Sequence, residues 1–339
     1  MPDNKQISIN KKWKELSTPD PEFPLEAKAP NNILIEITNA CNLRCKMCYN
    51  PQMKRKKGFI SEKLYKRVIN QAAELGVDNA GLYTTGESFL HPKIFEFIKY
   101  AKDKGIKYVY ITTNGQALNN DNIEKIFTSG LDSIKFSVDA GDKKSYESFK
   151  SASWDKLIDI MKKIKKMRDE KNSHLRIFAS FVVMPDNFND LTGYNNVFRN
   201  LVDEIKYTPI ANQGSQVNIE HTQLKAVSSL FSDLIAPKEE WSPCSFLWNR
   251  FIVTHEGYLT ICCVDFENQL IYGDLNKQSL IDCWNNKKIK EFREIHKMKE
   301  FTKLPMCYNC SFIKRNKKAH SLFLKEMDKI LKKEKESKK

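Results

Sequence analysis

The sequence predicts an α/β fold: a partial (β/α)6 barrel followed by a C-terminal cysteine-rich domain. Short apolar, β-branched runs alternate with segments of helical periodicity through the first two thirds of the chain. This alternation stops near residue 240, where turns and short strands begin. The 9 cysteines form two groups, one within 41–48 and the other within 244–310, with none between them. Grouped cysteines are typical of metal sites.

The expected strands and helices follow one another in strict order. The strands are expected at 33–37, 80–84, 108–112, 134–138, 177–183 and 216–220. Helices are expected near 61–75, 93–104, 121–129, 143–168 and 190–203. The first helix has the clearest ends, because Ser61 can cap its start and Gly76 can stop it. Each parallel connection needs a crossover helix, so this order favours a parallel sheet. Six units are fewer than the eight of a closed barrel, which predicts a partial barrel or an open sheet.

The domain organisation follows from the same pattern. We expect an N-terminal arm over 1–32, a core over 33–235, a cysteine-rich domain over 236–315 and a basic helical tail over 316–339. Short strands are expected in the cysteine-rich domain at 251–254 and 258–263.

The composition narrows the class of protein. Hydrophobic residues make up 41% and charged residues 29%, which is typical of a folded soluble chain. No apolar run approaches the roughly 18 residues of a membrane-spanning helix, and the polar N-terminus does not resemble a secretory signal. We therefore expect a cytoplasmic protein, in which disulfides are rare. The segment 314–339 carries half of the net charge of +14, which favours a solvated helix or, alternatively, a surface for anionic substrates.

The first cysteine group has Cys-x3-Cys-x2-Cys spacing, with Cys41, Cys45 and Cys48. Three thiolates so close in one loop can reach three corners of a 4Fe–4S cluster. A structural zinc site normally uses four protein ligands, so zinc or a chance arrangement is the weaker alternative. Three ligands leave one iron open to a small chelating molecule.

This motif resembles the cluster motif of the radical S-adenosylmethionine (SAM) superfamily, and the resemblance covers about 33–230. It implies that the amino and carboxylate groups of SAM chelate the open iron. It also implies that reductive cleavage of SAM yields a 5′-deoxyadenosyl radical, which abstracts a hydrogen from the substrate. Thr85-Gly86-Glu87 stands where the family has a Gly-Gly-Glu element that binds the methionine amine. The first glycine of that element is missing here, while Gly86 and Glu87 remain.

Four further residues match positions of the family that contact SAM. Met47 stands before the third cysteine, where the resemblance implies a backbone contact with adenine. Ser137 and Asp139 resemble the ribose and carboxylate contacts, and Asn114 lies at a neighbouring strand end. Ordinary strand-end or turn chemistry is the alternative for each polar residue.

The second cysteine group contains Cys244, a Gly-x4-Cys turn that ends at Cys262, and Cys307-x2-Cys310. These four thiolates can hold a second 4Fe–4S cluster, although zinc would accept the same set. The region resembles the auxiliary-cluster region of the SPASM/twitch group, and the single-cluster twitch form matches better because Cys310 is the last cysteine.

Two cysteines remain outside these sets. Cys283 lies in a helical context and is expected to be a buried thiol. Cys263 is expected to be a packed thiol, with an alternate cluster ligand or a hydrogen donor to a substrate radical as the alternatives.

The expected reaction follows from the second cluster. A cluster with four cysteine ligands has no open iron, so we expect it to transfer electrons and the reaction to be a two-electron oxidation. The resemblance to a dehydrogenase of aminocyclitol biosynthesis and to proteins of surface-polysaccharide loci favours a carbohydrate-like alcohol as substrate. Peptide modification and epimerisation with Cys263 are alternatives, and a zinc-dependent nucleic-acid-binding protein is a remote one. A flavodoxin- or ferredoxin-type reductant is the expected partner.

Overall fold

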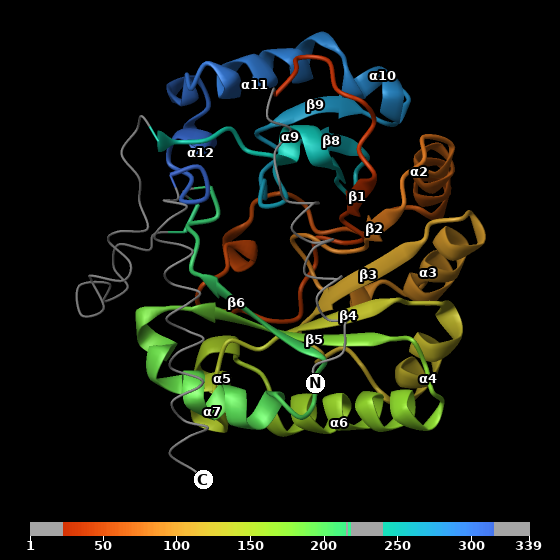
Figure 1. The fold of residues 1–339 in the computed structure, drawn as a ribbon, viewed down its shortest axis with the longest axis vertical. Helices are drawn as coiled ribbons and strands as arrows, with labels where there is room; N and C mark the ends of the chain where they lie inside the picture. The colour runs from red at the N-terminus through yellow and green to blue at the C-terminus, as the bar shows by residue number, and fades with distance from the viewer. Residues whose placement is uncertain (1–22, 215, 218–239, 315–339) are drawn as a thin grey trace, which may run out of the picture.

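The computed structural model describes residues 23–214, 216–217 and 240–314. Nine strands form one sheet in the order β6-β5-β4-β3-β2-β1-β7-β8-β9 (Figure 1). They are β1 (Asn32–Ile35), β2 (Asn79–Gly81), β3 (Tyr108–Thr113), β4 (Ser133–Ser137), β5 (Arg176–Val183), β6 (Glu204–Pro209), β7 (Phe251–Val253), β8 (Tyr258–Thr260) and β9 (Ile271–Asp274). Strands β1 to β6 pair in parallel, as the predicted partial barrel requires.

The cysteine-rich region is joined to this barrel through the sheet. Strand β7 pairs in parallel with β1, and β8 and β9 follow in antiparallel order. Residues 1–22 of the expected arm (1–32), the whole expected tail (316–339) and the expected boundary between residues 235 and 236 lie outside the described residues. Within the described part of the chain, no helix is both long enough and apolar enough to cross a membrane.

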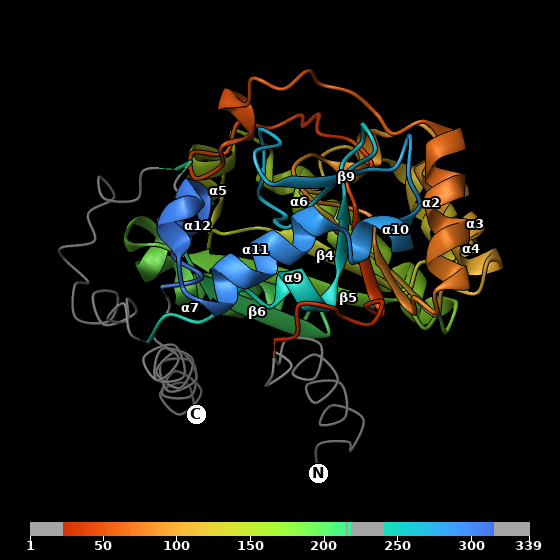
Figure 2. The same cartoon turned by 90° about the horizontal axis from the view of Figure 1, so that it is seen from above.

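The helices divide between the two regions. The helices of the barrel are α2 (Glu62–Glu74), α3 (Ile94–Asp103), α4 (Asn120–Ser129), α5 (Lys143–Lys150), α6 (Trp154–Glu170) and α7 (Leu191–Phe198). Those of the cysteine-rich region are α9 (Phe246–Asn249), α10 (Leu280–Trp284), α11 (Lys287–Lys297) and α12 (Pro305–Tyr308). In both views α10 and α11 lie beside β9 (Figures 1 and 2), and Figure 1 shows them at the end of the sheet away from α6.

Local sequence explains the helix ends. The Ser61 side chain accepts a hydrogen bond from the Leu64 amide and caps α2, and Gly76 follows the helix with a φ of 75°. The single helix expected over 143–168 is two helices. Ser151 adopts a left-handed φ of 53° and ends α5, and the Ser153 side chain caps α6.

The expectation for the sixth strand was wrong. The sequence predicted it at 216–220, but the strand that pairs with β5 is β6, at Glu204–Pro209. Residues 216–217 lie in a turn and bend, and 218–220 are outside the described residues. Strand β6 is the edge of the sheet and most of its side chains are only half-buried. Its sequence, EIKYTP, therefore lacks the continuous apolar run of a strand covered on both faces.

Side chains alternate between the two faces of the sheet. Outward-facing residues such as Ile33, Val109 and Ile134 join the main core with the helices. On the inner face, Leu34 and Tyr110 belong to a separate small cluster. The loops that follow the strands meet at their carboxyl ends, where parallel α/β folds place their chemistry.

Candidate functional site

A cavity of about 160 Å³ lies at the carboxyl ends of β1 to β4. Seven of the residues predicted for SAM and its cluster line it: Cys41, Cys45, Cys48, Gly86, Glu87, Asn114 and Ser137. The other lining residues are Leu43, Asn50, Pro51, Thr84, Thr85, Thr112, Thr113 and Lys150. The loops after the first three strands and the end of the fourth therefore contribute to one site.

The three cysteines of this cavity fit an iron–sulfur cluster. All nine cysteines of the chain are free thiols. Burial raises the pKa of Cys41 to about 11 and also raises the pKa values of Cys45 and Cys48. Thiols with raised pKa values stay protonated at neutral pH unless a metal ion binds them. The described lining residues include no fourth cysteine and no histidine, so a cubane here would keep one iron for another ligand.

Gly86 allows two backbone segments to approach closely. A Cβ atom at this position would lie 2.4 Å from the Thr38 carbonyl oxygen and 2.5 Å from that of Ala40. The Glu87 amide donates a 2.8 Å hydrogen bond to the same Ala40 carbonyl. Only glycine fits without displacing the backbone that leads into the cysteine loop. Thr85 stands in place of the first glycine of the family element, and its hydroxyl donates a hydrogen bond to Glu36.

Glu87 presents a buried carboxylate to the cavity, and its residue is only 2% exposed. One oxygen accepts hydrogen bonds from the Thr113 hydroxyl at 2.7 Å and the Phe89 amide at 3.2 Å. The other accepts from the Asn114 amide at 2.8 Å. Burial raises the pKa of Glu87 in spite of these donors. A buried carboxylate held by three donors and facing a cavity is suited to bind an ammonium group.

Asn50 connects the cysteine loop to the Thr85 segment and was missed by the sequence analysis. Its amide nitrogen donates to the Asn39 carbonyl at 2.9 Å and the Thr85 carbonyl at 2.5 Å. The Lys57 ammonium donates to the Asn50 side-chain oxygen at 3.0 Å. These partners are separated in sequence, so Asn50 carries no local signal of its role.

Lys150 is a second residue that the sequence analysis missed. Its side chain is 4% exposed, lines the cavity and forms an ion pair with Asp139. Burial alone would lower the pKa of Lys150, but the charges of Asp139 and Cys45 outweigh it and raise the pKa. Lys150 is one of 56 lysine and arginine residues, and nothing in its sequence context distinguishes it.

Two predicted contacts of SAM are not among the residues that line the cavity. Asp139 is not among these residues: it pairs with Lys150 and accepts a 2.7 Å hydrogen bond from the Val182 amide. Met47 is also absent from the lining, and its carbonyl accepts a 3.1 Å hydrogen bond from the Gln213 side chain. A role for either residue in binding SAM stays a prediction.

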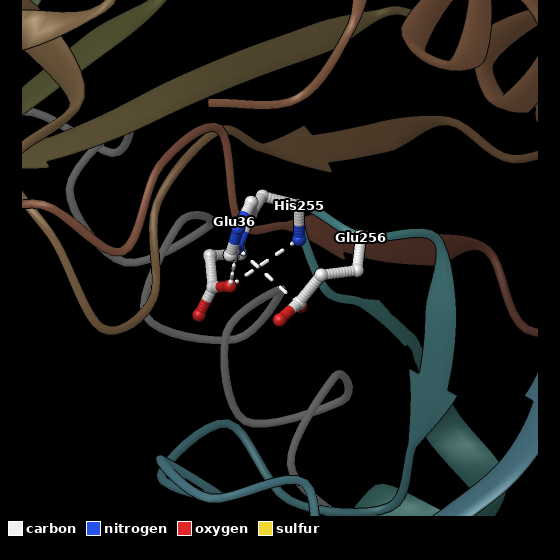
Figure 3. A group of neighbouring side chains, drawn as sticks. All are labelled: Glu36, His255 and Glu256. Atoms are coloured by element: carbon white, nitrogen blue, oxygen red, sulfur yellow. Dashed lines mark hydrogen bonds and ion pairs between the residues drawn. The ribbon is translucent and has the colours of Figure 1, made fainter. Parts of the chain in front are cut away.

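A buried ionic network lies beside the cavity, and Figure 3 shows three of its members, Glu36, His255 and Glu256. Glu36, directly after β1, accepts hydrogen bonds from Arg55 and Thr85, and lies 2.9 Å from Nδ1 of His255, shortly after β7. Burial acts to raise the pKa of Glu36, but His255, Arg55 and Thr85 together hold it below its usual value. Glu256 lies 3.4 Å from both Arg55 and His255.

This network has the form of a structural link. Glu36, His255 and Glu256 are close enough together to hold a metal ion. However, the Arg55 guanidinium already contacts both carboxylates and supplies the compensating cation. The network ties the cysteine loop and the Thr85 segment to the cysteine-rich region.

The four cysteines predicted for the second cluster line a separate, apolar cavity of about 30 Å³. Cys244, Cys262, Cys307 and Cys310 share it with Gly214, Leu247, Ile261, Leu270, His296, Met306 and Ile313. Burial raises the pKa of Cys244 to about 12 and also raises the pKa values of Cys262 and Cys307. Four converging thiols in an apolar enclosure fit a cluster that is fully ligated by protein.

The two remaining cysteines lie outside both cavities. Cys263 packs against the small cluster of Leu34, Tyr110 and Ile252 on the inner face of the sheet. Burial raises its pKa, so the thiol is protonated at neutral pH. Cys283 lies in α10 and is 0% exposed, which confirms the expected buried thiol.

Comparison with known proteins agrees with this geometry. The family model of the radical SAM superfamily matches residues 35–191, and that of the SPASM iron-sulfur cluster-binding domain matches residues 244–311. The tungsten-containing aldehyde ferredoxin oxidoreductase cofactor-modifying protein of Pyrococcus furiosus is 24% identical over 82% of this chain and 86% of that protein. The PqqA peptide cyclase of Gluconobacter oxydans is 32% identical over 32% of this chain and 30% of its own length.

Two solved structures share the fold. Streptococcus suis SuiB bound to precursor peptide SuiA has a TM-score of 0.62 and 16% identity, over 85% of this chain and 71% of that chain. BtrN in complex with AdoMet and 2-DOIA has a TM-score of 0.56 and 18% identity, over 84% of this chain and 94% of that chain.

The sequence matches and the cysteine sites together define the class of protein. The chain belongs to the radical SAM superfamily and carries a SPASM-type domain. It is a radical SAM enzyme whose cofactors are SAM and 4Fe–4S clusters.

Proposed function

We propose that this enzyme oxidises a carbohydrate-like alcohol by two electrons, with the second cysteine site as the electron acceptor. The observation that carries the proposal is the apolar enclosure formed around Cys244, Cys262, Cys307 and Cys310. Four protein thiolates leave no ligand position for substrate, so the group held there is suited to electron transfer. The fold shared with BtrN, a structure that holds AdoMet and 2-DOIA, supports a small-molecule substrate.

The first cavity would hold the cofactor that starts the reaction. Cys41, Cys45 and Cys48 would bind the 4Fe–4S cluster, which supplies the electron for reductive cleavage of SAM to a 5′-deoxyadenosyl radical. Glu87 would accept hydrogen bonds from the methionine ammonium. Lys150, whose ammonium has three donors and contacts Asp139, would offer a remaining donor to the methionine carboxylate.

The other predicted contacts would complete the SAM site. Asn114 and Ser137 line the cavity and would bind polar groups of the nucleoside. Met47 would contact adenine through its backbone, and Asp139 would act through Lys150, which it orients. The roles of Met47 and Ser137 follow the family positions that these residues match, whereas the role of Asp139 follows from its ion pair with Lys150.

Peptide modification is the second candidate function. Two relatives support it: the PqqA peptide cyclase in sequence and SuiB, solved with its precursor peptide, in fold. Epimerisation is a third candidate, and Cys263 supports it. Its thiol is protonated, lies on the inner face of the sheet and is separate from the second cysteine cavity. Hydrogen donation to a substrate radical requires such a protonated thiol.

The physiological setting of the reaction is also a proposal. A flavodoxin- or ferredoxin-type protein would supply the electron for SAM cleavage. The nine free cysteines suit a reducing compartment such as the cytoplasm.

The test separates the two cysteine sites. The wild-type protein and a Cys307→Ala/Cys310→Ala variant are reconstituted anaerobically, and the iron content of each is measured. Each protein is then incubated with alcohol and with peptide substrates, and 5′-deoxyadenosine and oxidised product are measured. We expect the variant to lose about half of its iron and all oxidised product while still forming 5′-deoxyadenosine. Oxidised product from a variant that lacks the second cluster would contradict the proposal, and modified peptide would favour the second candidate.

A further inference from the structure

A hydrogen bond to the imidazole of His296 determines which tautomer the ring adopts. His296 lies in α11 and is 0% exposed. Its Nδ1 accepts a 3.2 Å hydrogen bond from the backbone amide of Cys244. A ring nitrogen that accepts a hydrogen bond carries no proton, so the ring is neutral and its proton is on Nε2. Nε2 is therefore a hydrogen-bond donor.

This donor has no acceptor among the described residues. Nε2 of His296 is buried without a hydrogen-bond partner. Phe301 packs against the ring in a T-shaped contact, with centroids 5.1 Å apart, but offers no lone pair. A buried donor without an acceptor costs free energy, and native structures rarely leave one without a reason. The orphaned N–H therefore indicates a bound group that the protein itself does not supply.

The position of His296 indicates which group that is. His296 lines the same small cavity as Cys244, Cys262, Cys307 and Cys310. The other described lining residues are glycine, leucine, isoleucine and methionine, whose side chains have no N–H or O–H to donate. A donor enclosed with four thiols would meet the inorganic sulfides or the cysteine sulfurs of a cluster bound there.

We propose that His296 donates a hydrogen bond from Nε2–H to a sulfur of the cluster held by these four cysteines, and thereby raises its reduction potential. The inference rests on the proposed ligand set for the second cluster. Reduction increases the negative charge on the sulfurs, so a donor stabilises the reduced form more than the oxidised form. A higher potential makes the cluster a better acceptor for the electron of a substrate radical. His296 is thus a positioning residue, which also holds the Cys244 backbone through Nδ1.

The experiment measures the second cluster alone. In full-length protein with Cys41, Cys45 and Cys48 replaced by Ala, the remaining cluster is titrated against potential and followed by EPR. His296→Phe keeps an aromatic ring but removes both nitrogens, and we expect it to shift the potential to more negative values. His296→Gln keeps an acceptor and a donor, and we expect it to restore much of the wild-type potential. His91→Phe is the matched control. His91 is also buried, but its Nε2 lies 3.1 Å from the Ile60 carbonyl, away from this cavity.

A spectroscopic measurement tests the contact directly. With 15N-histidine labelling, we expect pulsed EPR of the reduced cluster to detect a nitrogen coupling that His296→Phe abolishes and His91→Phe retains. An unchanged potential in His296→Phe with full iron, or no histidine coupling in unsubstituted His296 protein, would overturn the inference. If His296→Phe fails to load iron, two other results test the inference. They are the histidine nitrogen coupling in protein with unsubstituted His296 and the reduction potential of the His296→Gln variant. Absence of any cluster in the triple-alanine background would instead refute the proposed second site.

Discussion

The Thr85 hydroxyl donates a hydrogen bond to the carboxylate of Glu36, and this contact joins the element that carries Glu87 to the end of β1. The same carboxylate binds Arg55 of the cysteine loop and His255 of the cysteine-rich region. Thr85 stands where the family has a glycine, so the hydroxyl adds a contact that glycine lacks. The two cysteine regions and the proposed SAM site therefore meet at one buried carboxylate.

Glu36→Gln should destabilise the protein. The substitution removes the negative charge that compensates Arg55, and breaking a buried ionic contact costs about 3 kcal/mol. Denaturant unfolding under anaerobic conditions measures the loss. Glu62→Gln is the control, because its carboxylate is exposed and should matter little. Equal stability of the Glu36→Gln and wild-type proteins would show that the network is not a structural link.

The same carboxylate predicts a pH dependence. Because the pKa of Glu36 is lower in the folded protein than its ordinary value of 4.5, its contribution to stability is present above pH 4.5. It is lost as the pH falls through the lower, folded pKa. Stability curves of wild type and Glu36→Gln should therefore converge in acid. Curves that stay parallel to the lowest pH measured would contradict this assignment.

Glu87→Gln should weaken SAM binding by roughly 10- to 100-fold, because the amide cannot compensate the methionine ammonium. Burial raises the pKa of Glu87, and only the carboxylate form pairs with an ammonium. The affinity of the wild-type enzyme should therefore fall as the pH is lowered through that pKa, and the variant should lack this dependence. Calorimetric titration with SAM measures both effects. An unchanged affinity would remove Glu87 from the proposed site.

Gly86→Ala should disrupt SAM binding through sterics alone. Its new methyl group would overlap the Thr38 and Ala40 carbonyls and displace Glu87 from the cavity. Gly76→Ala is the control: its methyl would meet nothing within 4 Å, although its φ of +75° makes alanine strained. We expect the control to lose stability but bind SAM normally. The measurement is SAM affinity beside thermal unfolding for both variants.

Lys150→Met should destabilise the fold by about 3 kcal/mol, because it leaves the Asp139 carboxylate buried without its cation. Lys150→Met/Asp139→Asn should recover part of this loss, since neither partner then carries an unpaired charge. SAM affinity should remain reduced in both variants if Lys150 contacts the methionine carboxylate. Recovery of affinity in the double variant would limit Lys150 to a structural role.

Cys263→Ala distinguishes oxidation from epimerisation. In the proposed oxidation the thiol is only packed on the inner face of the sheet, so turnover should be close to wild type. In an epimerase the same substitution would abolish product while 5′-deoxyadenosine still forms. The assay is product formation in deuterated water, where deuterium in the product would indicate hydrogen donation from an exchangeable thiol.

Features encoded by residues close together in the chain were predictable from the sequence. The spacing of Cys41, Cys45 and Cys48 is determined by covalent connectivity, so their convergence needed no knowledge of the fold. The alternation of strands and helices likewise indicated the parallel sheet. The second cysteine set was also expected to converge, and its four members line one cavity.

Several features of the fold and of the site have no local pattern in the sequence. The sixth strand lies at a sheet edge, where partial burial removes the apolar run that marks inner strands. Lys150, Glu36 and His296 are ordinary polar residues in their local sequence. Glu36 and His296 acquire their roles from partners far away in the chain, namely His255 and Cys244. Lys150 acquires its role by lining the cavity that contains the three cysteines.

The sequence by itself therefore determined the class of enzyme, its cofactors and the cysteine groups, because closely spaced ligands and periodic apolar residues are local properties. Only the tertiary structure decided which polar side chains are buried, which charges compensate one another and which donor is left for a bound group. Burial and pairing are long-range properties, since desolvation depends on every segment that packs around a side chain. His296 is the clearest case, because its free N–H exists only once α11 and Cys244 have come together.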